Sequence, residues 1–71
     1  MSYREGFVSS LMSIVSQINK AHQEKDEKLH NELMVTFWNM EEVAEERGIE
    51  LPEDNELLSP DFDWDEFRME G

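Results

Sequence analysis

The sequence predicts an all-α fold, in which a helical hairpin or one long bent helix is followed by a short C-terminal helix or acidic tail. Apolar residues recur at steps of three and four through residues 1–47, and no segment shows the alternation of a β-strand. Such steps line one face of a helix, whereas a strand repeats every second residue. We expect a single domain, with the helical part at residues 1–47 and an acidic loop and C-terminal segment at residues 48–71.

The first helix is expected to begin at about Tyr3. Ser2 and Glu5 have the spacing of a capping box, in which the serine oxygen and a glutamate three residues later satisfy free amides of the first turn. The apolar stripe that follows has members four, three, four and three residues apart: Phe7, Leu11, Ile14, Ile18 and Ala21. This spacing is typical of a helix that packs along another helix. The opposite face is rich in serine and carries little charge.

A second helix is expected over residues 27–47, with an apolar stripe formed by Leu29, Leu33, Phe37, Met40 and Ala44. The two stripes are separated by the charged stretch 21–28 and differ in register by one position. The shift indicates either a turn or a stutter within one long helix. No glycine or proline marks a turn there, so both forms stay open. We favour the hairpin, with Asp26 as the N-cap of its second helix.

Gly48 is expected to end the second helix, because glycine readily adopts the left-handed conformation found just beyond helix ends. Pro52 follows and cannot continue a helix. Residues 48–58 are therefore expected to form a loop. Ile49 and Leu51 are its apolar members near the helix end, and we expect them to fold back onto the helices.

The C-terminal segment contains a second helix-start signal. Ser59 is a candidate N-cap and Pro60 suits a first helical position, which predicts a short helix at about 60–68. Aromatic residues alternate with acids in this segment: Phe62, Trp64 and Phe67. Two interpretations stay open. The aromatic rings dock on the hairpin and enlarge a thin core, or they meet a partner's basic and partly apolar groove.

The small size of the chain predicts self-association. A chain of 71 residues buries a modest share of its surface, and such scaffolds usually need disulfides, a metal or oligomerisation. Cysteine is absent, and in one helix His22 and His30 would lie roughly 12 Å apart along the axis. We therefore expect no disulfide, no metal site and no cofactor. Two hairpins closing a four-helix core would form a homodimer.

Negative charge dominates the composition and is concentrated in one half. The net charge is −12; residues 1–40 carry five acids and four bases, whereas residues 41–71 carry thirteen acids and two bases. Nucleic acid and anionic membranes would repel such a surface, so direct binding to either is not expected. A basic protein is the partner that this charge favours.

Several other classes of protein are disfavoured by the sequence. A glycine-rich phosphate loop and a serine–histidine–acid arrangement are both missing, so we expect no enzyme. Asp61, Asp63 and Asp65 have the odd-position spacing of a calcium loop, but Glu66 stands where an EF-hand requires glycine. No stretch is apolar enough for a membrane span or a signal-peptide core. A cytoplasmic location is the expectation.

The candidate site is a set of clustered acids in the C-terminal half. The first group lies near the end of the second helix, where like charges four residues apart and carboxylates beside the helix C-terminus both reduce stability. The second group lies in the aromatic segment. Together the candidate partner-binding residues are Glu41, Glu42, Glu45, Glu46, Asp61, Asp63, Trp64, Asp65 and Glu66. The alternative is a solvated surface that serves only solubility.

In size, charge and its acidic half, the chain resembles small acidic phage proteins of the DNA-mimic kind, among them phage inhibitors of the bacterial nucleoid protein HU. The resemblance implies an inhibitor that binds a basic DNA-binding protein in the host cytoplasm and competes with DNA. One alternative is a helical adaptor that engages a partner through the apolar faces of helices 3–22 and 27–47. Another is an antitoxin-like partner whose acidic tail folds onto a basic toxin.

Overall fold

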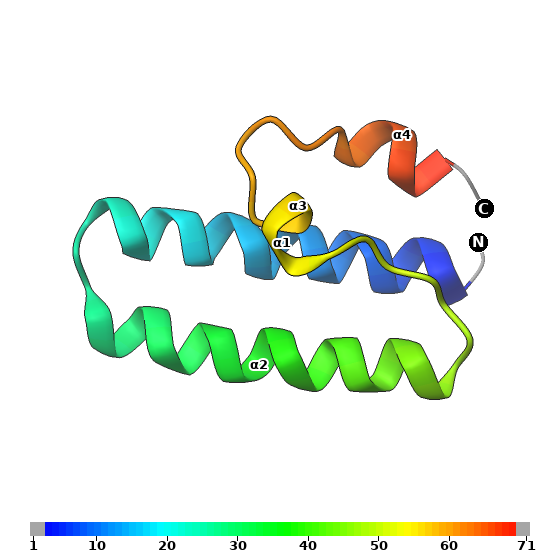
Figure 1. Ribbon diagram of the computed structural model, residues 1–71, viewed down its shortest axis with the longest axis horizontal. Helices are drawn as coiled ribbons and strands as arrows, with labels where there is room; N and C mark the ends of the chain where they lie inside the picture. The colour runs from blue at the N-terminus through cyan, green and yellow to red at the C-terminus, as the bar shows by residue number, and fades with distance from the viewer. Residues whose placement is uncertain (1–2, 70–71) are drawn as a thin grey trace.

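The structure is a computed structural model that describes residues 3–69, and it is an antiparallel helical hairpin partly covered by two short helices (Figure 1). The hairpin consists of α1 (Tyr3–Gln23) and α2 (Glu27–Glu46), and the covering helices are α3 (Asp54–Leu57) and α4 (Trp64–Met69). The described residues contain no strand. The all-α prediction and the hairpin are confirmed, and the single bent helix is wrong. Ser2 of the expected capping box lies outside the described residues.

The turn between α1 and α2 is a helix-terminating motif without its usual glycine. The Asp26 amide donates to the Ala21 carbonyl (2.9 Å) and the Lys25 amide to the His22 carbonyl (3.1 Å). This pair of bonds defines a Schellman motif, whose penultimate residue takes a left-handed conformation. Here that residue is Lys25, with φ of 59°. Because lysine occupies the position that glycine normally takes, the turn left no glycine signal in the sequence.

Asp26 joins the two helices in a second way. Its carboxylate accepts a hydrogen bond from the Leu29 amide at 3.2 Å, which confirms it as the N-cap of α2. An N-cap satisfies an amide that has no partner within its own helix. One residue therefore ends α1 through its backbone and begins α2 through its side chain, and this fixes the hairpin with a very short connection.

The end of α2 repeats the motif with glycine in place. Gly48 has φ of 72°, its amide donates to the Glu45 carbonyl (3.2 Å), and the Ile49 amide donates to the Ala44 carbonyl (2.8 Å). The prediction that Gly48 follows the helix end is confirmed. Ile49 and Leu51 pack against the core, as expected for a segment that folds back.

The sequence predicted a loop at residues 48–58, and this prediction is wrong in part because α3 forms within the segment. The Leu57 amide donates to the Glu53 carbonyl at 3.0 Å, and the Leu57 side chain is fully buried. This single helical turn packs the leucine against the core residues of α1 and α2. Four residues are too few to show helical periodicity, so the pattern could not reveal the turn.

The C-terminal helix begins later than predicted. It starts at Trp64, after Asp63, whose carboxylate accepts a hydrogen bond from the Glu66 amide at 3.0 Å. The Ser59 hydroxyl instead accepts a bond from the Asp61 amide at 3.2 Å. The serine thus stabilises a turn rather than a helix start. Asx and Ser turns use the same residue types as helix caps, so the sequence signal was ambiguous.

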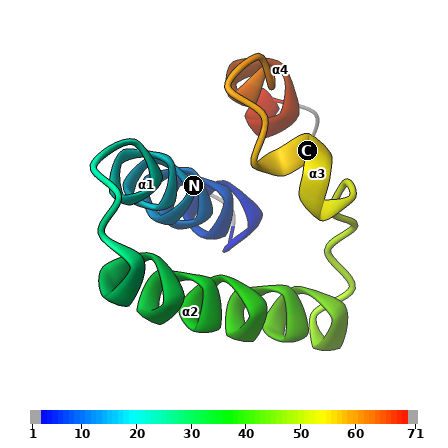
Figure 2. The same ribbon diagram turned by 60° about the vertical axis from the view of Figure 1, so that its left-hand side comes forward.

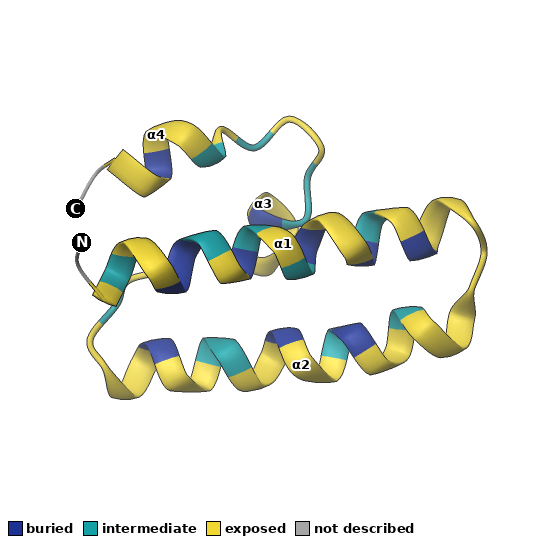
Figure 3. Ribbon diagram, turned by 180° about the vertical axis from the view of Figure 1, so that it is seen from behind, coloured by how far each residue is buried: buried dark blue, intermediate teal, exposed yellow. Residues whose placement is uncertain are grey.

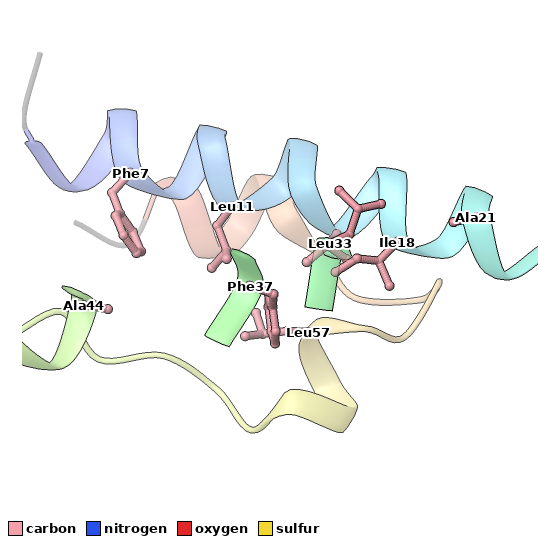
Figure 4. Packing of buried hydrophobic residues seen from close by; sticks show 9 residues of the cluster. Phe7, Leu11, Ile18, Ala21, Leu33, Phe37, Ala44 and Leu57 are labelled. Carbon is pink, nitrogen blue, oxygen red and sulfur yellow. The ribbon is translucent and has the colours of Figure 1, made fainter. Parts of the chain in front are cut away.

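The core lies where α1, α2 and α3 meet (Figure 4). Leu11, Phe37 and Leu57 contribute one fully buried side chain from each helix, at 0% exposure. Ile14 and Met40, expected as members of the stripes, are half-buried, whereas Val8 and Val15 are buried.

Leu29 was expected in the core but is 40% exposed. It lies in the first turn of α2, at the end of the hairpin that α3 and α4 do not reach (Figure 1). With only two helices there, the packing is thinner than in the middle of the molecule.

The third layer over the hairpin comes from the chain itself. Partly buried side chains between residues 49 and 67 pack on the core: Ile49, Leu51, Leu58, Phe62 and Trp64. Figure 3 shows that the buried positions of α1 and α2 lie mainly on their facing sides, with the outer sides exposed. The apolar stripes that suggested a four-helix dimer are thus covered within one chain, and self-association stays a prediction.

Candidate protein-binding surface

The acids of the first predicted group lie in the last turns of α2. Glu42, Glu45 and Glu46 are exposed, whereas Glu41 is half-buried. Burial, a hydrogen bond to Asp54 and the negative charge of that residue together raise the pKa of Glu41 to about 7. Glu41 is therefore part of the contact between α2 and α3, and the other three acids form the accessible group.

The acids of the second predicted group surround the start of α4. Asp61, Asp63, Asp65 and Glu66 are exposed, whereas Trp64 is half-buried. The Trp64 ring packs edge-on against Phe62, with ring centroids 4.9 Å apart. Phe67 is buried beside them, with its centroid 5.7 Å from that of Phe62. The aromatic residues therefore dock on the hairpin, one of the two interpretations considered, and leave the acids at the surface.

The structure does not bring the two acidic groups together. α1 contacts both α2 and α4 and lies between them in both views (Figure 1, Figure 2). The molecule extends over 34 × 24 × 21 Å, so the groups lie on opposite sides of a small body. The outer face of α1 is exposed and uncharged over much of its length: Ser10, Ser13, Ser16 and Gln17.

The arginines near these acids are used in contacts within the protein. Arg4 donates to the backbone carbonyls of Phe67 (2.7 Å) and Arg68 (3.1 Å), and its guanidinium lies 4.9 Å from the Phe67 ring centroid. These bonds cap the C-terminal end of α4 and hold it on α1. Arg47 lies over the Tyr3 ring at 4.8 Å.

Charge pairing is sparse across the described residues. One ion pair occurs in residues 3–69, between Arg68 and Asp65 at 3.5 Å on the exposed side of α4. All the lysines lie at the other end of the molecule, around the turn between α1 and α2: Lys20, Lys25 and Lys28. The acidic groups are thus left largely without neutralising side chains.

The hairpin brings the two histidines together, which the spacing in one helix did not suggest. The ring centroids of His22 and His30 are 5.9 Å apart at the turn. Within residues 3–69, no group of three or more histidine, cysteine, aspartate or glutamate side chains is arranged to hold a metal ion. The spacing of roughly 12 Å expected from a continuous helix is therefore wrong, because the chain reverses between these residues.

Trp38 is a surface residue, although it directly follows the buried Phe37. Its side chain is 53% exposed, and Val35, one turn earlier, is 52% exposed. Position on the helical wheel could have revealed this, because residue 38 lies roughly 100° from Phe37 around the helix axis.

Comparison with protein-family models, with curated proteins and with solved structures finds no match for this chain. In the described part of the chain, no helix combines the length and apolar character needed to cross a bilayer. The fold and the charge pattern define an acidic all-α hairpin protein, and its function is inferred from its own residues.

Proposed function

We propose that this protein is a DNA-mimic inhibitor: it binds a basic DNA-binding protein, of the nucleoid type or similar, and competes with DNA for the same groove. The observation that carries the proposal is the exposure of the carboxylates on α2 and around α4 with a single ion pair among the described residues. Unpaired surface charge of one sign produces a long-range field that steers an oppositely charged partner.

The arrangement of the acids adds support. Duplex DNA presents two phosphate strands on either side of a groove, the major groove being about 12 Å wide. Here two acidic groups flank the uncharged outer face of α1, one on α2 and one around α4. A basic groove that contacts both strands of a duplex would meet negative charge on both sides of this protein as well.

The adaptor alternative uses a surface that is largely buried. The apolar faces of α1 and α2, which such an adaptor would offer, enclose the core with Leu57 and the segment that follows it. The antitoxin-like alternative uses a tail that folds onto its partner, whereas α4 already packs on α1. Val35 and Trp38, on the outer face of α2, are among the large apolar side chains that stay exposed for a partner.

A displacement assay with HU and fluorescent duplex DNA tests the proposal. One variant replaces Asp61, Asp63 and Asp65 with asparagine, which retains the N-cap at residue 63. A second replaces Glu42, Glu45 and Glu46 with glutamine. Each removes three charges from one acidic group. We expect wild type to release DNA and each variant to require about tenfold more protein, because association depends on charge.

The matched control removes the same number of charges from the opposite end of the molecule. Glu24, Glu27 and Glu32 are exposed and lie near the lysines, and their replacement by glutamine keeps the net charge equal to that of the test variants. We expect the control to displace DNA nearly as well as wild type. Equal loss in all three variants would show that only net charge matters, and failure of wild type at low salt would reject the proposal.

A further inference from the structure

The outer face of α2 carries a continuous exposed stripe with helix-packing geometry. Its members are four, three, four and three residues apart, and all are exposed: Asn31, Val35, Trp38, Glu42 and Glu45. This is the spacing by which one helix packs along another. The inner stripe of α2 has such a partner in α1, and the outer stripe has none among residues 3–69.

The apolar part of the stripe is concentrated at two side chains. Trp38 and Val35 are each about half exposed, at 53% and 52%. Tryptophan is over-represented among the residues that contribute most to binding at interfaces. Tyr3 is exposed to a similar extent, 54%, but its ring is stacked on Phe7 and covered by the Arg47 guanidinium. Trp38 has no such ring or cation partner within the described residues.

The charges beside this apolar patch decide what can cover it. Glu42 and Glu45 follow Trp38 by one and two turns on the same face. A second copy of the chain, itself at −12, would bring like charges together across the contact. Like-charge juxtaposition opposes association. A partner with an apolar side chain and cations one turn further along its surface is complementary in both respects.

We propose that the outer stripe of α2 is a docking surface for a basic amphipathic helix of another protein. The inference rests on the proposed function in that it takes the partner to be a basic protein. The apolar side chains of the partner helix contact Trp38 and Val35, and its lysines or arginines pair with Glu42 and Glu45. Ridges of side chains at these spacings pack into the grooves of a facing helix. Glu42 and Glu45 attract the basic side chains of the partner helix. Trp38 adds an apolar contact to the partner, which the phosphates of DNA would not provide.

The probe is a designed helical peptide of leucine and lysine whose leucines line one face, titrated into the full-length protein. Binding is followed by calorimetry and by two-dimensional ¹H–¹⁵N NMR. We expect shifts along the outer face of α2 and at the Trp38 indole. Trp38→Ala and Val35→Ala should each weaken binding, the former by about tenfold, as for a central interface residue. Val43→Ala is the control, because Val43 is 37% exposed on the same helix but lies outside the stripe.

A scrambled peptide of the same composition separates docking from charge attraction. We expect it to bind more weakly and without dependence on Trp38. Equal binding of both peptides, shifts centred on α4, or unchanged affinity of Trp38→Ala with intact helical circular dichroism would overturn the inference. Self-association abolished by Trp38→Ala would overturn it in favour of a second copy. The assay contains no DNA and no nucleoid protein, so its failure is distinct from a failure of DNA displacement.

Discussion

Phe37 and Trp38 are adjacent in the sequence but have opposite environments. Phe37 is completely buried among side chains of α1 and α3, whereas Trp38 is 53% exposed on the far side of α2. A step of one residue rotates a side chain by roughly 100° around a helix, which is enough to exchange core for solvent. Phe37 contributes to stability, whereas Trp38 belongs to the proposed docking surface. Substitutions at the two residues should therefore have different effects.

Phe37→Ala should lower the free energy of unfolding by about 3–5 kcal/mol, because it leaves a cavity where a fully buried ring had been. This is a large part of the total stability of a small domain, typically about 5–15 kcal/mol. Urea denaturation followed by circular dichroism measures the loss. Trp38→Ala is the control and should change stability far less. Similar losses for both substitutions would contradict the burial of Phe37 beside an exposed Trp38.

Glu41 makes the stability of the protein depend on pH. Burial, then the hydrogen bond to Asp54 and its charge, raise the pKa of Glu41 from 4.5 to about 7. The folded state therefore holds the Glu41 proton more tightly than the unfolded chain does. The stabilisation from this proton is fully present below pH 4.5 and is lost as the pH rises through about 7.

The prediction is that Glu41→Gln stabilises the protein at alkaline pH and has little effect in acid. Glutamine keeps the shape of the protonated carboxyl and cannot lose a proton. Thermal unfolding of wild type and variant at about pH 5 and about pH 8 measures the difference, which follows from proton linkage. Glu42→Gln is the control, since Glu42 is exposed. An equal shift at both pH values would contradict the proposed contact between Glu41 and Asp54.

At the scale of secondary structure, the same terminating motif closes α1 and α2 with different residues. Lys25 and Gly48 both have positive φ, at 59° and 72°. A side chain at such a position costs roughly 1–2 kcal/mol, which glycine avoids. A Cβ added at Gly48 would meet no atom within 4 Å, so only the backbone conformation would resist it.

Two substitutions at these positions should therefore act in opposite directions. Gly48→Ala should destabilise the protein by about 1 kcal/mol, from the cost of a left-handed alanine. Lys25→Gly should stabilise it by about 0.5 kcal/mol, because the relief of strain exceeds the extra flexibility of glycine in the unfolded chain. Chemical denaturation of both variants measures the effects. A destabilised Lys25→Gly would show that the lysine side chain contributes more than its backbone strain costs.

The long elements could be predicted from sequence, and the short ones could not. Helices of about twenty residues show several periods of the apolar pattern, so α1, α2 and the stop at Gly48 were recognisable. Lys25 concealed the turn because its conformation is uncommon for lysine. The helix at residues 54–57 is one turn long, and Ser59 forms a turn with the residue types of a helix cap.

For the molecule as a whole, sequence predicted which acids are clustered but not where the clusters lie. Their separation depends on α4 packing against α1 on the side away from α2. That placement is fixed by tertiary contacts, above all the bonds from Arg4 to the end of α4. The half-buried state of Glu41 depends on α3, which the sequence pattern did not reveal. Exposure of Trp38, by contrast, could have been inferred from its position roughly 100° around the helix axis from Phe37.

The central claim is that exposed carboxylates replace DNA phosphates on a basic protein, and its most direct test is the salt dependence of DNA displacement from HU. Affinity of the wild-type protein for HU is measured from low to high salt by competition. We predict a steep linear fall of the logarithm of affinity with the logarithm of salt, as electrostatic association requires. The Asp61, Asp63 and Asp65 to asparagine variant should give a shallower slope. An affinity that does not change with salt, or no displacement at low salt, would contradict the account.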